Sequence, residues 1–182
     1  MNKVILGLDV STSRIGISVI DYNSNLLRSE FIKLNSKESL EDRCYQVENY
    51  INNINSYNSI NNKGYYIEEV FIESPFIMFS GGKTTAMTMA KLQRFNGMVC
   101  YMLYKSLKIV PVSIAANKAR GLVGLKVKRG ENTKLKAIEW VQNEYPKGFI
   151  VEYTRHGNPK PGTDDMADSV VIARAGLLIE KE

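Results

Sequence analysis

The sequence predicts an α/β protein built on a mixed five-stranded sheet that is flanked by helices. Three short apolar segments separated by turn residues open the chain and predict three antiparallel strands. Helical and strand patterns then alternate, which places helices on the faces of the sheet. The chain has 182 residues, of which 44% are hydrophobic and 24% charged. This size and composition are typical of one globular domain, so we expect residues 1–182 to form a single domain.

Each predicted strand is a short, β-prone apolar run that ends at polar or turn-forming residues. The five strands are expected at 3–9, 15–21, 26–34, 66–73 and 109–112. The segment 22–25 has the composition of a tight turn, and Pro75 closes the fourth strand. The segment 149–153 fits either a further strand or a loop, and the pattern does not decide between them.

Five helices are predicted from apolar residues at helical spacing and from capping residues. The first begins at Asn35 or Ser36, has one apolar face and ends in an Asn-rich segment. The others are expected at 84–107, 113–121, 131–145 and 163–179. The helix at 84–107 is apolar on more than one face, so it is either sandwiched or at a subunit interface. We expect a homodimer interface along this helix.

Composition excludes several classes of protein. Two cysteines, Cys44 and Cys100, cannot form a disulfide framework or a four-cysteine zinc site. No run of about 18 uncharged apolar residues is present, so we expect no membrane span and a cytoplasmic protein. The excess of 24 basic over 19 acidic side chains permits a polyanionic partner without establishing one.

Four acidic residues occupy positions where acids are uncommon. Asp9 and Glu73 each end a predicted strand that is otherwise apolar. A lone buried carboxylate is costly and needs a partner or a metal ion. Asp165 and Asp168 lie three residues apart near the start of the last helix, and therefore on one face of it.

These acids point to a metal site. Grouped carboxylates raise one another's pKa, and hard divalent cations remove that penalty. Oxygen-only ligands suit Mg²⁺, with Mn²⁺ as a substitute, and two such ions can activate water against a phosphodiester. We hypothesise that Asp9 bridges two ions and that Glu73 and Asp168 each complete one ion's site. Asp165 would support a metal ion or a water molecule.

Each acid has a plainer explanation when it is taken alone. Asp164, Asp165 and Asp168 are favoured near a helix N-terminus by the helix dipole. Glu73 could be a surface acid at the end of a strand. Asp9 is the hardest to explain in this way, and the joint placement of the acids favours the metal site.

Three segments of the chain stand out as motifs: 7–16 (Gly-Leu-Asp-Val-Ser-Thr-Ser-Arg-Ile-Gly), 72–75 (Ile-Glu-Ser-Pro) and 165–173 (Asp-Met-Ala-Asp-Ser-Val-Val-Ile-Ala). Together they resemble the RuvC-like Holliday junction resolvases of the RNase H superfamily. The resemblance covers nearly the whole chain and implies an RNase H-like fold, which agrees with the predicted order of elements. The family's acids fall on Asp9, Glu73, Asp165 and Asp168, with Asp164 as an extra acid beside the last pair.

The resemblance also implies an activity. It is that of a homodimeric, Mg²⁺-dependent endonuclease that resolves four-way DNA junctions by paired symmetric nicks, leaving 5′-phosphate and 3′-hydroxyl ends. The Asn-rich and basic segments are more similar to virus or phage members, for which the cytoplasm would be that of the host cell. Flaps, forks or RNA remain alternative substrates, and a non-catalytic nucleic-acid-binding domain is a further alternative.

A basic segment at 118–136 carries seven cationic side chains against one acid. Neutralising DNA phosphates is the natural use of such a segment, and a solvated charged face is the alternative. The candidate DNA-binding residues here are Lys118, Arg120, Lys126, Lys128, Arg129 and Lys134.

The loop after the fourth strand is a second candidate for DNA contact. It holds Phe76, Phe79 and Lys83, and aromatic rings in a loop can stack on bases. Packing of these rings against the long helix is the alternative. His156, the one histidine of the chain, is expected at the surface rather than in catalysis.

A different class of protein shares one local motif. The segment 9–13 resembles the phosphate loop of sugar kinases and actin-like ATPases. Those proteins need a second nucleotide-binding domain, for which 182 residues leave too little room.

Overall fold

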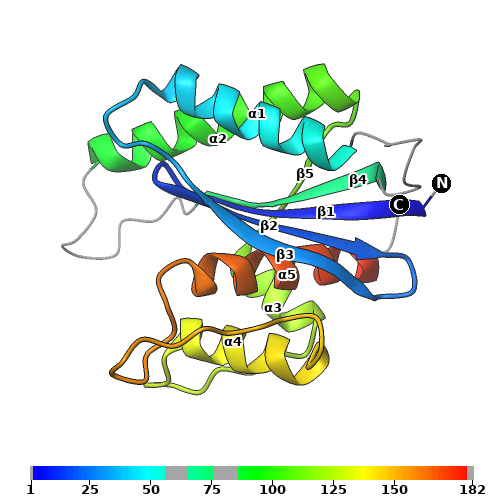
Figure 1. Ribbon diagram of the computed structural model, residues 1–182, viewed down its shortest axis with the longest axis vertical. Coiled ribbons are helices and arrows are strands. Elements are labelled where there is room, and N and C mark those ends of the chain that lie inside the picture. The colour runs from blue at the N-terminus through cyan, green and yellow to red at the C-terminus, as the bar shows by residue number, and fades with distance from the viewer. Residues whose placement is uncertain (1, 56–64, 76–85, 180–182) are drawn as a thin grey trace.

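The computed structural model describes residues 2–55, 65–75 and 86–179 and confirms the predicted mixed sheet (Figure 1). Its strands are β1 (Asn2–Val10), β2 (Arg14–Asp21), β3 (Leu26–Lys33), β4 (Tyr65–Glu73) and β5 (Val112–Ile114), in the spatial order β3-β2-β1-β4-β5. The first three strands are antiparallel, whereas β4 runs parallel to β1 and β5 runs parallel to β4. The central position of β1 places its C-terminal end between β2 and β4.

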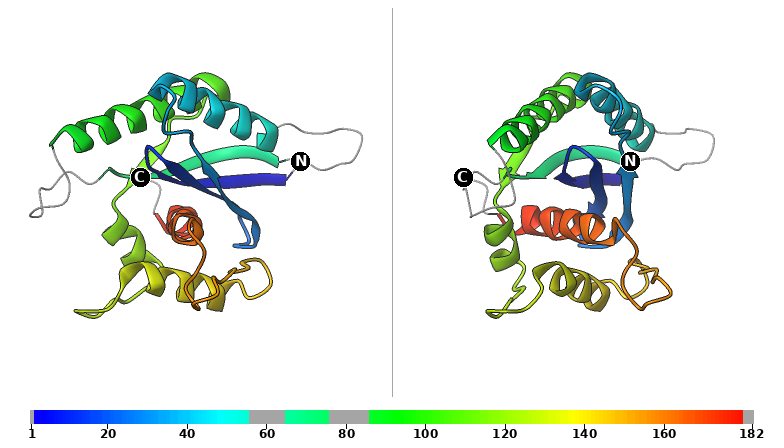
Figure 2. Two further views of the ribbon diagram at one scale, coloured as in Figure 1. Left: turned by 60° about the vertical axis from the view of Figure 1, so that its left-hand side comes forward. Right: turned by 90° about the vertical axis from the view of Figure 1, so that its left-hand side faces the viewer.

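Helices cover both faces of the sheet. Helices α1 (Leu40–Asn55) and α2 (Ala86–Leu107) lie on one face, and α5 (Thr163–Leu178) lies on the other (Figures 1 and 2). Helices α3 (Ala116–Leu122) and α4 (Thr133–Glu144) pack on α5 and form an outer layer. None of the helices in the described ranges combines the length and apolar character that a membrane span requires.

The side chains of β1 alternate strictly between these two layers, as the period of a strand requires. Val4, Leu6 and Leu8 belong to the core beneath α1 and α2. Ile5 belongs to the core beneath α5, so Gly7 and Asp9 face α5 as well. Asp9 therefore ends a buried strand on the face that the last helix covers.

Helix α5 lies unusually close to the sheet because small residues meet at the contact. A Cβ atom at Gly7 would lie 2.4 Å from the carbonyl oxygen of Ser169, and one at Gly16 would lie 1.9 Å from that of Asp165. Ser18, which pairs with Gly7 in the sheet, is buried, and its hydroxyl donates a 2.7 Å hydrogen bond to the same Ser169 carbonyl. The position of α5 along and above the sheet is therefore fixed at the end that carries Asp165.

Several predicted element boundaries were wrong at the N-terminal ends of helices. Helix α1 begins at Leu40, after Ser39, whose hydroxyl accepts a hydrogen bond from the backbone N–H of Asp42. Asn35, one of the two predicted capping residues, instead bonds Lys37 and Glu38 within a turn that precedes the helix. The second, Ser36, also lies before the helix.

Similar shifts occur in the second half of the chain. Strand β5 is Val112–Ile114 rather than 109–112, and Ser113 lies within it instead of capping α3. Helix α4 is capped by Asn132, and Gly162, in a left-handed conformation, is the cap residue of α5. The segment 149–153 is not a strand, and its one ladder contact is an isolated bridge between Tyr153 and Pro159.

The close approach at Gly16 leads to a stability prediction. Gly16→Ala is expected to lower the free energy of unfolding by about 1–3 kcal/mol, because the new methyl group collides with the backbone of α5. Gly121→Ala is the matched control, since no atom lies within 4 Å of a Cβ there and alanine favours the helix by up to about 1 kcal/mol. Thermal or denaturant unfolding of both variants tests this, and equal effects would contradict the close contact.

Candidate functional site

The parallel pairing of β1 and β4 brings the first two acids side by side. Leu8 lies level with Ile72 in the ladder, so the next residues, Asp9 and Glu73, lie side by side at the C-terminal ends of β1 and β4. Phe71 packs on the α5 side, and Glu73, two residues later, faces the same way. The backbone N–H of Ser74 donates to Ile114, which holds the end of β4 against β5.

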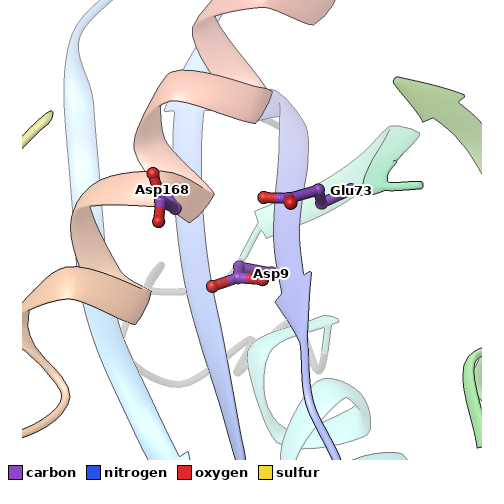
Figure 3. A group of neighbouring side chains, drawn as sticks. All are labelled: Asp9, Glu73 and Asp168. Carbon is purple, nitrogen blue, oxygen red and sulfur yellow. The ribbon is translucent and has the colours of Figure 1, made fainter. Parts of the chain in front are cut away.

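Helix α5 supplies the third acid. One carboxylate oxygen each from Asp9, Glu73 and Asp168 can be chosen so that all three lie within 4.8 Å of one another. Figure 3 shows the three side chains converging from β1, β4 and α5. The predicted convergence of these residues, which are remote in sequence, is therefore present in the fold. They line an open cleft of about 470 Å³.

The surroundings of the three acids disfavour their ionised forms. Burial, followed by the charges of Glu73 and Asp168, raises the pKa of Asp9 well above its ordinary value. Burial and the charge of Asp168 raise the pKa of Glu73 to about 7, despite the opposing charges of Arg120 and Lys134. Burial raises the pKa of Asp168 to about 6. Oxygen donors that repel one another in a partly buried cleft fit a hard divalent cation such as Mg²⁺ or Mn²⁺.

Asp165 lines the same cleft but has a different partner. Its Oδ2 atom lies 2.7 Å from Nε of Arg14, the first residue of β2, and the two form an ion pair. Within the described ranges neither atom has an aligned hydrogen-bond partner, although both are buried. Burial and the charge of Asp164 raise the pKa of Asp165, and Arg14 opposes them. Direct metal binding by Asp165 stays a prediction.

The extra acid, Asp164, is engaged outside the three-acid group. Its carboxylate accepts a hydrogen bond from the ammonium group of Lys134. Burial acts to raise the pKa of Asp164, but the bond and charge of Lys134 outweigh it and the pKa is lowered. Of the two neighbouring acids, Asp165 therefore lies at the cleft and Asp164 at a surface ion pair.

Two residues of the basic segment lie in the cleft itself. A guanidinium nitrogen of Arg120, from α3, lies 3.8 Å from Oδ1 of Asp168, and Lys134, from α4, also lines the cleft. The other predicted DNA-binding residues of the segment are exposed: Lys118, Lys126, Lys128 and Arg129. Phe76, Phe79 and Lys83 lie outside the described residues. His156 is exposed, as expected, beside Arg155.

Sequence reasoning missed two arginines. Arg14 stands within the first of the motif segments and was given no role there. Arg43 is 4% exposed, and its guanidinium donates to the backbone carbonyls of Thr12, Ser36 and Glu38. It thereby fixes the turn that follows β1. One signal was available, because Arg43 falls at the helical spacing of the buried apolar face of α1.

Comparison with known proteins identifies the fold. No known family profile matches the chain, and neither does any curated protein sequence. Thermus thermophilus RuvC in complex with a Holliday junction substrate superposes with a TM-score of 0.63 over 95% of this chain and 91% of that one, at 14% identity. Another structure of Thermus thermophilus RuvC gives a TM-score of 0.60 over 94% and 92%, at 16% identity. The protein therefore has the RNase H-like fold of RuvC.

Proposed function

We propose that this protein is a divalent-metal-dependent endonuclease that resolves four-way DNA junctions. The observation that carries the proposal is the convergence of Asp9, Glu73 and Asp168 at one edge of the sheet. The fold supports it, since it is shared with a RuvC protein described in complex with a Holliday junction substrate. The proposed activity is hydrolysis of phosphodiesters by paired nicks that leave 5′-phosphate and 3′-hydroxyl ends.

The residues of the cleft have separate roles in this proposal. Asp9, Glu73 and Asp168 hold the divalent cation, which supplies positive charge beside the phosphate and lowers the pKa of water. Arg120 and Lys134 come from other elements and line the same cleft, where they can bind the non-bridging oxygens of a phosphate. Arg120 forms a fork of donors suited to a phosphate, whereas Lys134 contributes a point charge.

The exposed basic residues extend this surface. Lys126, Lys128 and Arg129 lie in the segment that joins α3 to α4. Val127, which lies between two of these cations, lines a neighbouring pocket with Arg120 and Thr133, and both of those residues also line the cleft. We assign them to contacts with the DNA backbone on either side of the scissile phosphate.

The exposed face of α2 supports a homodimer. Tyr101 is 68% exposed and Tyr104 50% exposed, and the space in front of Gly97 on the same helix is open. Exposed rings around a glycine allow close contact with a second copy, and a dimer would present two cleavage sites to one junction. Light scattering in solution measures the molar mass that this proposal requires.

The central prediction concerns Asp9. Asp9→Asn is expected to reduce Mg²⁺-dependent cleavage of a four-way junction by roughly 10³-fold or more, on the scale of losses when an essential catalytic group is removed. Junction binding should persist, because the amide keeps the shape of the side chain and the basic surface is unchanged. Gel assays of cleavage and binding measure both effects.

Asp42→Asn is the matched control for this variant, because Asp42 is an exposed acid in the first turn of α1. Its cleavage rate should equal that of the wild type. Cleavage by Asp9→Asn at the wild-type rate would overturn the proposed site. Duplex, flap and fork substrates in the same assay decide between a junction resolvase and a nuclease for other branched DNA.

The raised pKa values predict a stability that depends jointly on pH and metal. Folding raises the pKa of Glu73 from 4.5 to about 7 and that of Asp168 from 3.8 to about 6. The folded state thus binds protons more tightly, so these acids lower the free energy of unfolding of the metal-free protein as pH rises from about 4 to 7. A bound divalent ion should reverse this loss.

Melting curves at pH 5 and pH 8, with chelator or with Mg²⁺, test the prediction. At about 100 times the Kd, metal binding contributes about 2.7 kcal/mol, or roughly 5–10 °C in Tm for a chain of this size. The gain should be larger at pH 8, because protons compete with the metal at pH 5. A gain that is equal in Asp9→Asn would show that the ion binds elsewhere.

The basic segment leads to a prediction about salt dependence. Replacing Lys126, Lys128 and Arg129 together by Gln should weaken junction binding and make the negative slope of log K against log salt shallower by about 2–3. The control triple variant is Lys37→Gln, Lys108→Gln and Lys147→Gln, whose side chains are exposed and are not among the residues that line the cleft. An unchanged slope in the first variant, or an equal change in the control, would remove the segment from the DNA interface.

A further inference from the structure

Arg14 is held in a fixed position beside the acids. The Ser11 hydroxyl accepts a hydrogen bond from the backbone N–H of Arg14 at 3.0 Å and donates to its carbonyl at 2.8 Å. Arg43 holds the same turn through the carbonyl of Thr12. Because Gly16 faces α5, Arg14 two residues earlier extends toward the same helix. The turn that follows Asp9 thus places the guanidinium group of Arg14 beside the first turn of α5.

The Arg14–Asp165 pair is close but poorly bonded. Nε of Arg14 and Oδ2 of Asp165 are 2.7 Å apart, and the side chains are 30% and 11% exposed. Neither atom has an aligned hydrogen bond within the described residues. A buried ion pair offsets its desolvation only when its geometry and its other hydrogen bonds are good. The guanidinium of Arg14 therefore occupies this carboxylate oxygen chiefly through its charge, and a metal ion would have to displace that charge to bind the oxygen.

Asp165 lies near the metal-binding acids without joining them. The group with mutually close oxygens contains Asp9, Glu73 and Asp168, whereas Asp165 lines the cleft beside them. Its charge also raises the pKa of Asp9 and of Asp168, which shows how near it is. Three acids are thus available to one cation, and the fourth is already occupied by an arginine.

We propose that Arg14 is a positioning residue that withholds Asp165 from metal, so that the protein without DNA binds one divalent ion tightly and a second only weakly. This inference rests on the proposed function, because it takes Asp9, Glu73 and Asp168 as the first metal site. In this arrangement Arg14 and a second ion compete for the same buried oxygen of Asp165. Removing the guanidinium strengthens the second site and leaves the three ligands of the first site in place.

Titration with Mn²⁺ in the absence of DNA tests this directly, because the electron paramagnetic resonance signal of free Mn²⁺ reports how many ions are bound. Arg14→Gln should bind a second ion with a Kd lower by roughly 10- to 100-fold, as changes around metal ligands typically produce. Arg14→Lys should restore the weak second site, since it keeps the charge. Arg28→Gln, which removes an arginine paired with Glu30 on β3, is the matched control and should behave as wild type.

A second variant distinguishes this role from a purely structural one, in which the Arg14–Asp165 pair only holds β2 against α5. Asp165→Asn should lower the affinity for the first ion only slightly, through the loss of one nearby charge, and should abolish the gain caused by Arg14→Gln. Loss of first-ion binding in Asp165→Asn would overturn the inference, because Asp165 would then already be a ligand. An unchanged second site in a folded Arg14→Gln protein would overturn it as well.

The same titration distinguishes this inference from the function on which it rests. If the wild type binds Mn²⁺ and Asp9→Asn does not, the metal site stands whatever Arg14 does. If the wild type binds no Mn²⁺, or Asp9→Asn binds it equally well, the proposed metal centre fails and the role of Arg14 fails with it.

Discussion

The contact between α5 and the first two strands is the constraint on which the site depends. Asp9 belongs to the sheet and Asp168 to the helix, so the distance between helix and sheet sets the distance between their carboxylates. Gly7 and Gly16 allow that distance to be short, and the bond from Ser18 to the backbone of α5 fixes it. Core packing and site geometry therefore rest on the same few small residues, and a change that loosens one loosens the other.

The acid cluster opposes folding when no cation balances it. Burial and mutual repulsion raise the pKa of Asp9, Glu73 and Asp168. Keeping these three carboxylates ionised in the folded chain therefore costs free energy that solvent-exposed carboxylates would not cost. The rigid edge of the sheet enforces this arrangement, because parallel pairing leaves Asp9 and Glu73 no alternative register. Strain of this kind at a site is expected where the function requires it and the surrounding fold is stable enough to maintain it.

The sequence predicted the sheet and the acids because both are local signals. Strand alternation and an acid ending an apolar run are visible without any tertiary information, as at Asp9 and Glu73. Helix starts were less predictable, since Asn35 and Ser39 are both capable caps and the surrounding packing selects between them. The partner of Arg14 could not be predicted, because a long side chain reaches whichever acid the fold brings near, and Asp165 is remote in sequence. The short strand β5 likewise depends on the free edge of β4.

The charges of the cleft affect how many divalent ions the protein can bind when no DNA is present. Four acids and two basic side chains line the cleft: Asp9, Glu73, Asp165, Asp168, Arg120 and Lys134. Their formal sum is −2, which one divalent ion neutralises, whereas a second ion would leave an excess of positive charge in a partly buried cleft. In the proposed function, a DNA phosphate would bring negative charge to the same place. Substrate and second ion should therefore favour each other's binding, because each reduces the electrostatic cost of the other.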